Sequence, residues 1–186
     1  LWIRFNIGHL ANWTFITMSS ELRVDKIIPT AGAPTGGGGG VVQVVHASTQ
    51  IGQSQGFSTN SFADTGLSAS ITPKFSTSKI LVTGYLSYYV TISGVGSAEW
   101  NFAVCDGSNN ILDGTSAEAQ GYRFNEYYVL GGKHPINFLH SPSTTSSFTY
   151  KMRMNAKSAN QSGNLVCQRN GSANNISRIT LMEVSA

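Results

Sequence analysis

Strict alternation of apolar and polar residues is the feature that most limits what this chain can fold into. The clearest run is 147–156, whose apolar set is Phe148, Tyr150, Met152, Met154 and Ala156. A second run starts at Ile80 and keeps the same period to Val90. A period of two is typical of a β-strand that turns one face to a core and the other to water or a partner.

Similar short runs fill the rest of the chain from Val41 onward. They lie at 41–47, 67–73, 98–106, 122–130, 135–141, 164–169 and 176–184. Residues that favour turns separate them: Pro73, Gly94 to Gly96, Asp106-Gly107, Asp113-Gly114, Gly131-Gly132, Ser141-Pro142 and Asn170-Gly171. About eight to ten short strands in one domain favour two packed antiparallel sheets. We therefore predict that residues 41–186 form an all-β, antiparallel β-sandwich of jelly-roll type.

Charge is scarce in this chain. Only 11% of its 186 residues are Asp, Glu, Lys or Arg, compared with roughly 25% in ordinary soluble domains. This excludes coiled coils and charged disordered tails, and no apolar run reaches the length of about 18 residues that spans a membrane. The net charge is +3, but the basic residues are scattered and only Lys151, Arg153 and Lys157 approach a stripe. We expect no nucleic-acid partner and no membrane insertion.

Two segments precede the linker to the predicted sandwich. Residues 1–17 are apolar with polar interruptions, and Met18 resembles a start, so this stretch is interpreted as either upstream read-through or an apolar docking arm. Residues 18–31 are too short to hold a core. Their apolar residues, spaced for an extended segment, are Leu22, Val24, Ile27 and Ile28.

Residues 32–40 are predicted to be a glycine-rich linker. Its hinge consists of Gly36, Gly37, Gly38, Gly39 and Gly40. A phosphate-binding loop is excluded because no Lys-Ser/Thr pair follows the glycines and the next element is a predicted strand rather than a helix.

No motif predicts catalysis, a metal site or a cofactor. The histidines lack the spacing of known metal motifs: His9, His46, His134 and His140. His134 precedes Pro135 and is expected in a turn. Glu99 and Glu126 lie on strand patterns and are the one candidate carboxylate pair for a glycan-degrading enzyme. The sequence does not give the distance between the two carboxylates.

The two cysteines, Cys105 and Cys167, do not have the spacing of a zinc or redox motif. We expect buried free thiols. A disulfide could form if their strands were neighbours, so the sequence leaves their oxidation state open.

Tyrosines are the best sequence candidates for a receptor-binding or subunit interface. The candidates are Tyr85, Tyr89 and Tyr127. Each combines an apolar ring with a polar hydroxyl, a combination that recognition surfaces favour. The many Asn, Ser and Thr residues around them can hydrogen-bond to sugars or sister subunits at a lower desolvation cost than charges.

Several phrases of the chain resemble virion structural proteins of tailed bacteriophages. They are SELRVDKIIPT, the tether GAPTGGGGG, FADTGLSASITPKFSTSKILV, SPSTTSSFTYKMRM and ITLMEV. The chain looks most like fibre and appendage proteins of marine cyanobacterial phages, and the likeness covers residues 18–186.

The resemblance implies a homotrimer whose carboxy-terminal jelly roll is of the tumour-necrosis-factor type. It implies that residues 18–31 attach to other virion proteins, with Leu22, Val24, Ile27 and Ile28 as the docking residues. It also implies that the apolar faces at 150–154 and 179–182 belong to the sandwich or to the trimer seam.

The function that we expect on this basis is a non-enzymatic virion fibre or spike, assembled in the host cytoplasm, whose distal domain contacts host-surface polysaccharide. Two binding alternatives remain: a capsid decoration or cement protein, and a secreted carbohydrate-binding or cytokine-like module. The last alternative is a glycan-degrading enzyme, which would need Glu99 and Glu126 as its carboxylate pair.

Overall fold

The computed structural model describes residues 40–50, 52–56, 61–93, 96–114, 122–124, 128–158, 162–168 and 175–185. All of them lie in the unit Ala33–Ala186. The strongest predicted strand, 147–156, is present as β9, Phe148–Ser158. The second, which starts at Ile80, lies within β4, Lys79–Ser93.

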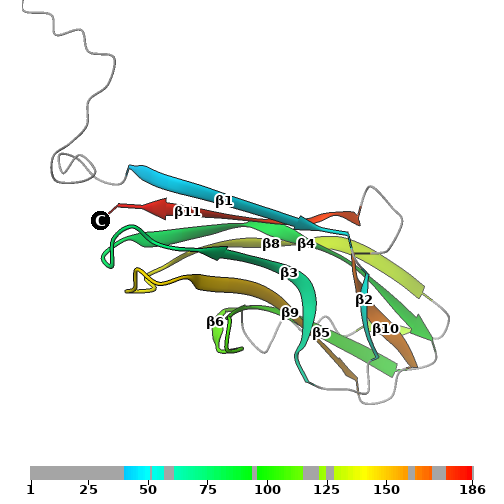
Figure 1. The fold of residues 1–186 in the computed structure, drawn as a ribbon. Coiled ribbons are helices and arrows are strands. Elements are labelled where there is room, and N and C mark those ends of the chain that lie inside the picture. Colours follow the sequence, from blue (N-terminus) through cyan, green and yellow to red (C-terminus); the bar gives the residue numbers. More distant parts are fainter. Residues whose placement is uncertain are drawn as a thin grey trace, which may run out of the picture. The chain divides into compact units, whose positions relative to one another are not determined.

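The strands form two antiparallel sheets that face each other (Figure 1). The six-stranded sheet contains β1 (Val41–Thr49), β2 (Gln53–Gly56), β4, β8 (Tyr128–His140), β10 (Ser162–Cys167) and β11 (Ser177–Val184). The five-stranded sheet contains β3 (Ala63–Ile71), β5 (Gly96–Asp106), β6 (Ile111–Asp113), β7 (Tyr122–Phe124) and β9.

The strand pairing is that of a jelly roll. β8 pairs along one side of β4, while β11 and β10 follow one another along its other side. The first strand, β1, pairs with the last, β11, and β2 pairs with β10. The chain changes sheet between β2 and β3, β3 and β4, β4 and β5, β7 and β8, β8 and β9, and β9 and β10. This double-sheet winding confirms the predicted all-β, antiparallel jelly-roll sandwich.

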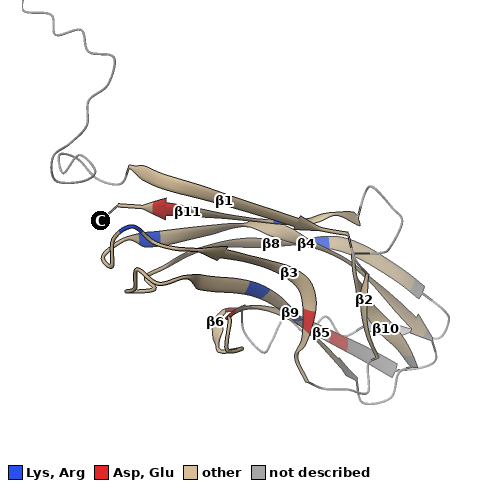
Figure 2. Ribbon diagram, viewed as in Figure 1, with Lys and Arg blue, Asp and Glu red and all other residues tan. Residues whose placement is uncertain are grey.

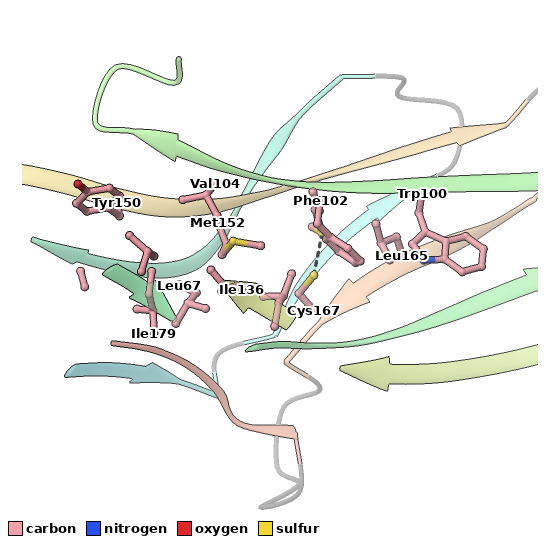
Figure 3. Packing of buried hydrophobic residues seen from close by; sticks show 14 of the residues in the cluster. Leu67, Trp100, Phe102, Val104, Ile136, Tyr150, Met152, Leu165, Cys167 and Ile179 are labelled. Carbon is pink, nitrogen blue, oxygen red and sulfur yellow. Dashed lines mark hydrogen bonds between the residues drawn. The ribbon is translucent and has the colours of Figure 1, made fainter. Parts of the chain in front are cut away.

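The core lies between the sheets and is built from the inward residues of each alternating strand (Figure 3). Tyr150, Met152 and Met154 of β9 face Ile179 and Leu181 of β11 in this cluster. Close contact between the sheets is visible where the Cys167 thiol lies 3.3 Å from the Met154 sulfur. The expected apolar faces at 150–154 and 179–181 therefore fill the sandwich, whereas Met182 points to the outer side of β11.

One sequence prediction was wrong around Gly131-Gly132 and Pro135. We expected a turn there between two strands, but β8 runs without interruption from Tyr128 to His140. The two glycines pair with Tyr89 and Tyr88 of β4, and Pro135 pairs with Tyr85. Since β8 is paired only with β4 among the described strands, it has a free side on which a missing N–H is tolerated.

The prediction for His134 was wrong for the same reason. It lies on β8 instead of in a turn, and its ring is 4.9 Å from that of Phe102 between the sheets.

None of the described residues forms a helix long and apolar enough to cross a membrane.

Candidate functional site: the outer face of the six-stranded sheet

The outer face of the six-stranded sheet carries a continuous line of apolar side chains. Register places Val44 of β1 beside Met182 of β11, Met182 beside Leu81 of β4, and Leu81 beside Leu139 of β8. We call these four residues the apolar row. Val44 and Leu139 are 57% and 54% exposed, and Val41, 58% exposed, lies at the same end of the sheet. Their inward neighbours along each strand are in the core, so alternation leaves the row outside.

The next line across the same face is polar and uncharged. It consists of His46, Thr180, Thr83 and Asn137. His46 Nδ1 and Thr180 Oγ1 are 3.0 Å apart and join β1 to β11 on the surface. Figure 2 shows how sparse charged residues are along the drawn strands. Covering this part of the sheet would therefore bury few charges.

Two of the predicted tyrosines lie on this face, farther along β4. Tyr85 and Tyr89 occupy outward positions and are half-buried. The Lys133 ammonium lies 4.6 Å from the centre of the Tyr85 ring, in a cation–π contact. Tyr127 lies outside the described residues.

Beside these residues the face is hollowed. The hollow has a volume of about 360 Å³, and its lining includes Ser87, Tyr89, Val129, Gly131, Lys133 and Asn175. It lies at the junction where β10 ends and β11 begins along β4. At the junction the Ser87 N–H donates to Ser177 Oγ at 2.9 Å, and the Gln168 N–H donates to the Ser87 carbonyl at 3.0 Å.

Sequence reasoning found Tyr89 but missed the hollow. Gly131 was assigned to a turn, whereas it lies opposite Tyr89 in the ladder and leaves the space above that position empty. Lys133 and Asn175 come from distant parts of the chain with no shared motif. Their approach depends on strand register, which turn signals predicted wrongly here.

A second polar cluster, centred on Glu183, lies at the end of the sandwich near the apolar row. The carboxylate is fully buried and accepts hydrogen bonds from Gln43 Nε2 at 2.6 Å, the Lys74 N–H at 2.7 Å and the Phe75 N–H at 3.3 Å. Burial disfavours the charged form, but the Ser78 hydroxyl and these donors outweigh it and lower the pKa of the carboxyl. The sequence signal that could have predicted this cluster is Glu183 itself, a charged residue at an inward position of the alternating run of β11.

Two cationic residues on the other sheet share one aspartate as ion-pair partner. Arg153 Nε lies 2.9 Å from Asp64 Oδ1, and Lys151 Nζ lies 3.5 Å from Asp64 Oδ2. The short basic stripe seen in the sequence is therefore partly an ion-pair network across β3 and β9, which weakens its similarity to a nucleic-acid surface.

The described histidines and cysteines do not form a reactive centre. No group of His, Cys, Asp and Glu among the described residues has the arrangement of a metal site. Cys105 and Cys167 are free and buried, as expected, and burial raises the pKa of both thiols. Glu99 lies on β5, and Glu126 lies outside the described residues.

His140 Nδ1 and the Tyr150 hydroxyl are 2.8 Å apart at the edge of the core. Burial lowers the pKa of the histidine and raises that of the tyrosine, so both side chains are held neutral in the fold.

The predicted docking and hinge residues are mostly outside the part of the chain that the structure describes. This holds for Leu22, Val24, Ile27, Ile28 and 36–39. Gly40 is described: its carbonyl accepts a hydrogen bond from the Ser185 N–H at 3.1 Å, which continues the pairing of β1 with β11.

No family model and no curated protein matches the sequence. Solved structures with a similar arrangement include those of the Gx and Gt strains of infectious bursal disease virus. Their TM-scores are 0.37 and 0.40 at 11% and 12% identity, over 78% of this chain and 38% of theirs. The VP2 subviral particle of that virus has a TM-score of 0.39 at 11% identity, over 77% of this chain and 40% of that one. With TM-scores this low, the fold assignment rests on the strand pairing alone.

Proposed function

We propose that this protein is a structural, non-enzymatic component of a virion, a trimeric fibre or spike. The observation that carries the proposal is the apolar row on the outer face of a low-charge jelly roll. Val44 and Leu139 expose more than half of their side chains in one continuous line. Contiguous exposed apolar side chains on a folded domain mark surfaces that bind other proteins.

Sister subunits are the partner that this face fits best. The apolar row contributes burial of apolar area, and the neighbouring line of Thr, Asn and His side chains contributes hydrogen bonds without desolvated charge. The number of three subunits comes from the resemblance of the sequence to phage appendage proteins. In this arrangement residues 18–31 attach the trimer to other virion proteins, and the linker separates that anchor from the jelly rolls.

The exposed ends of three jelly rolls would then meet the host surface together. Weak sites on linked subunits bind multivalently, because the first contact raises the effective concentration of the others. Host-surface polysaccharide is the receptor class that we propose, since hydroxyl-, amide- and tyrosine-rich faces suit sugars. The particle is assembled in the host cytoplasm.

The test is the location of the protein on intact particles. Mass spectrometry of purified virions should detect the chain, and gold-labelled antibody against residues 41–186 should mark the tail or its fibres. Labelling over the whole head would overturn the fibre assignment in favour of a decoration protein. Absence of the chain from purified particles would overturn the virion role itself.

A further inference from the structure

The hollow beside Tyr89 differs in chemistry from the rest of the outer face. It lies eight residues along β4 from Leu81 of the apolar row, about 26 Å at the rise of a β-strand. The two features therefore occupy opposite ends of one sheet face, and an assembly that covers the row can leave the hollow open.

The lining of the hollow combines a flat floor with an aromatic wall. Gly131 supplies no side chain opposite Tyr89, so the ring borders open space. Asn175 adds an amide and Ser87 a hydroxyl to the lining. A volume of about 360 Å³ lies in the range of small-ligand sites. An apolar ring face with a few surrounding hydrogen-bonding groups suits a sugar ring.

The charge of the lining indicates which kind of sugar the hollow would bind. Lys133 contributes an ammonium to the lining, and no described lining residue carries a carboxylate. The Tyr85 ring holds this ammonium by the cation–π contact at 4.6 Å, which limits its freedom on the exposed strand. A positioned cation with no anion among the described lining residues favours a negatively charged group on the ligand.

We propose that this hollow is a binding site for an acidic saccharide, a sugar ring that carries a carboxylate. Tyr89 packs against the ring, Lys133 pairs with the carboxylate, and Asn175 hydrogen-bonds to ring hydroxyls. The proposal rests on the proposed function in that it names the class of host polysaccharide that the distal domain contacts.

The test measures binding of a short oligogalacturonate to the intact chain by calorimetry, with a neutral galactan of equal length as the comparison. We expect binding of the acidic oligomer only, which weakens as salt rises. Lys133→Gln should weaken it by roughly tenfold or more, since it removes a charge-assisted hydrogen bond. Lys79→Gln is the matched control: it removes a lysine at the far end of the neighbouring strand, β4, and should leave binding unchanged.

Gly131→Val tests the hollow by filling it. A Cβ at position 131 meets its nearest atom, the Tyr88 carbonyl oxygen, at 3.5 Å, an ordinary contact. A β-branched residue also suits a strand. We therefore expect this variant to keep its melting temperature and to lose oligogalacturonate binding.

Three results would overturn the site: no binding of oligogalacturonate by the unaltered chain, equal binding of the neutral galactan, or unchanged binding by both Lys133→Gln and Gly131→Val. None of them bears on the mass of the assembly or on its place on the particle, so failure of the site and failure of the virion role are distinguishable.

Discussion

The buried carboxylate of Glu183 links three parts of the chain by hydrogen bonds: β11, β1 and the segment between β3 and β4. It accepts hydrogen bonds from the β1 side chain of Gln43 and from the backbone amides of Lys74 and Phe75 in the segment between β3 and β4. A buried ion is stable only when such donors replace its water. Glu183 thus holds the end of the sandwich together, close to the apolar row.

Glu183→Gln should destabilise the fold by about 2–3 kcal/mol, because the new NH2 group faces the Gln43 Nε2 donor and the charge that the backbone N–H groups stabilised is gone. Denaturant unfolding at neutral pH measures the loss. Asp113→Asn, which alters an exposed carboxylate, should change stability by less than about 0.5 kcal/mol. Equal effects of the two substitutions would contradict the role of Glu183.

Protonation of His140 should make stability depend on pH near neutrality. Its pKa in the fold lies below the ordinary value of 6.5 because burial disfavours the cation, although the Asp106 carboxylate opposes this weakly. As pH falls below about 6.5, the unfolded chain takes up a proton on this histidine before the folded chain does. The stability that depends on neutral His140 is therefore present above pH 6.5 and is lost as pH falls through the folded pKa.

Melting temperatures between pH 7.5 and 5.5 check this expectation. The unaltered chain should lose stability on acidification, whereas His140→Gln should be less stable at pH 7.5 and show a flatter profile. A profile for His140→Gln as steep as that of the unaltered chain would refute the argument.

At the scale of the element, β4 is the strand around which the six-stranded sheet is organised. Gly84 lies at its centre, paired with Ile179 of β11 and Ile136 of β8. Its φ of 151° is rare for residues with a side chain, and a Cβ there would lie 2.1 Å from the carbonyl oxygen of Arg178. Only glycine allows β11 to approach β4 this closely.

Gly84→Ala should therefore cost more than about 2 kcal/mol, because either the ladder or the backbone conformation must change. Thermal unfolding measures this cost. Gly131→Ala is the matched control on the neighbouring strand, where the new methyl makes only ordinary contacts and stability should stay within about 1 kcal/mol. Equal stability of both variants would show that β11 can move away from Gly84 freely.

Sequence patterns predicted some elements better than others, for physical reasons. The strands β9 and β4 were found because one face is buried along most of their length and the period of two is clear. β8 was predicted as two strands instead of one because Gly131, Gly132 and Pro135 normally break strands. They are tolerated here because β8 has one free side among the described strands. β2, with sequence QSQG, has no apolar alternation: its inward Gln55 accepts the Ala156 N–H at 2.8 Å instead.

The candidate site was predicted only in part. Tyr85 and Tyr89 could be named from residue type, and the structure places both on the outer face. The apolar row could not be predicted, since its residues come from four strands and meet only through register across the sheet.

For the whole molecule, the apolar row gives the jelly roll a face for self-association. Leu139→Lys places a charge at the β8 end of the apolar row, where it would be desolvated in an assembly but not in a monomer. We expect this variant to keep its melting behaviour as a monomer and to lose trimerisation. Ile111→Lys, at a residue 51% exposed on the other sheet, is the control and should leave the assembly intact.

The mass of the intact chain in solution tests the central claim most directly. Sedimentation or light scattering at micromolar concentration should give three times the 19.9 kDa of one chain. A mass of one chain under the same conditions would contradict trimeric assembly through the outer face of the six-stranded sheet.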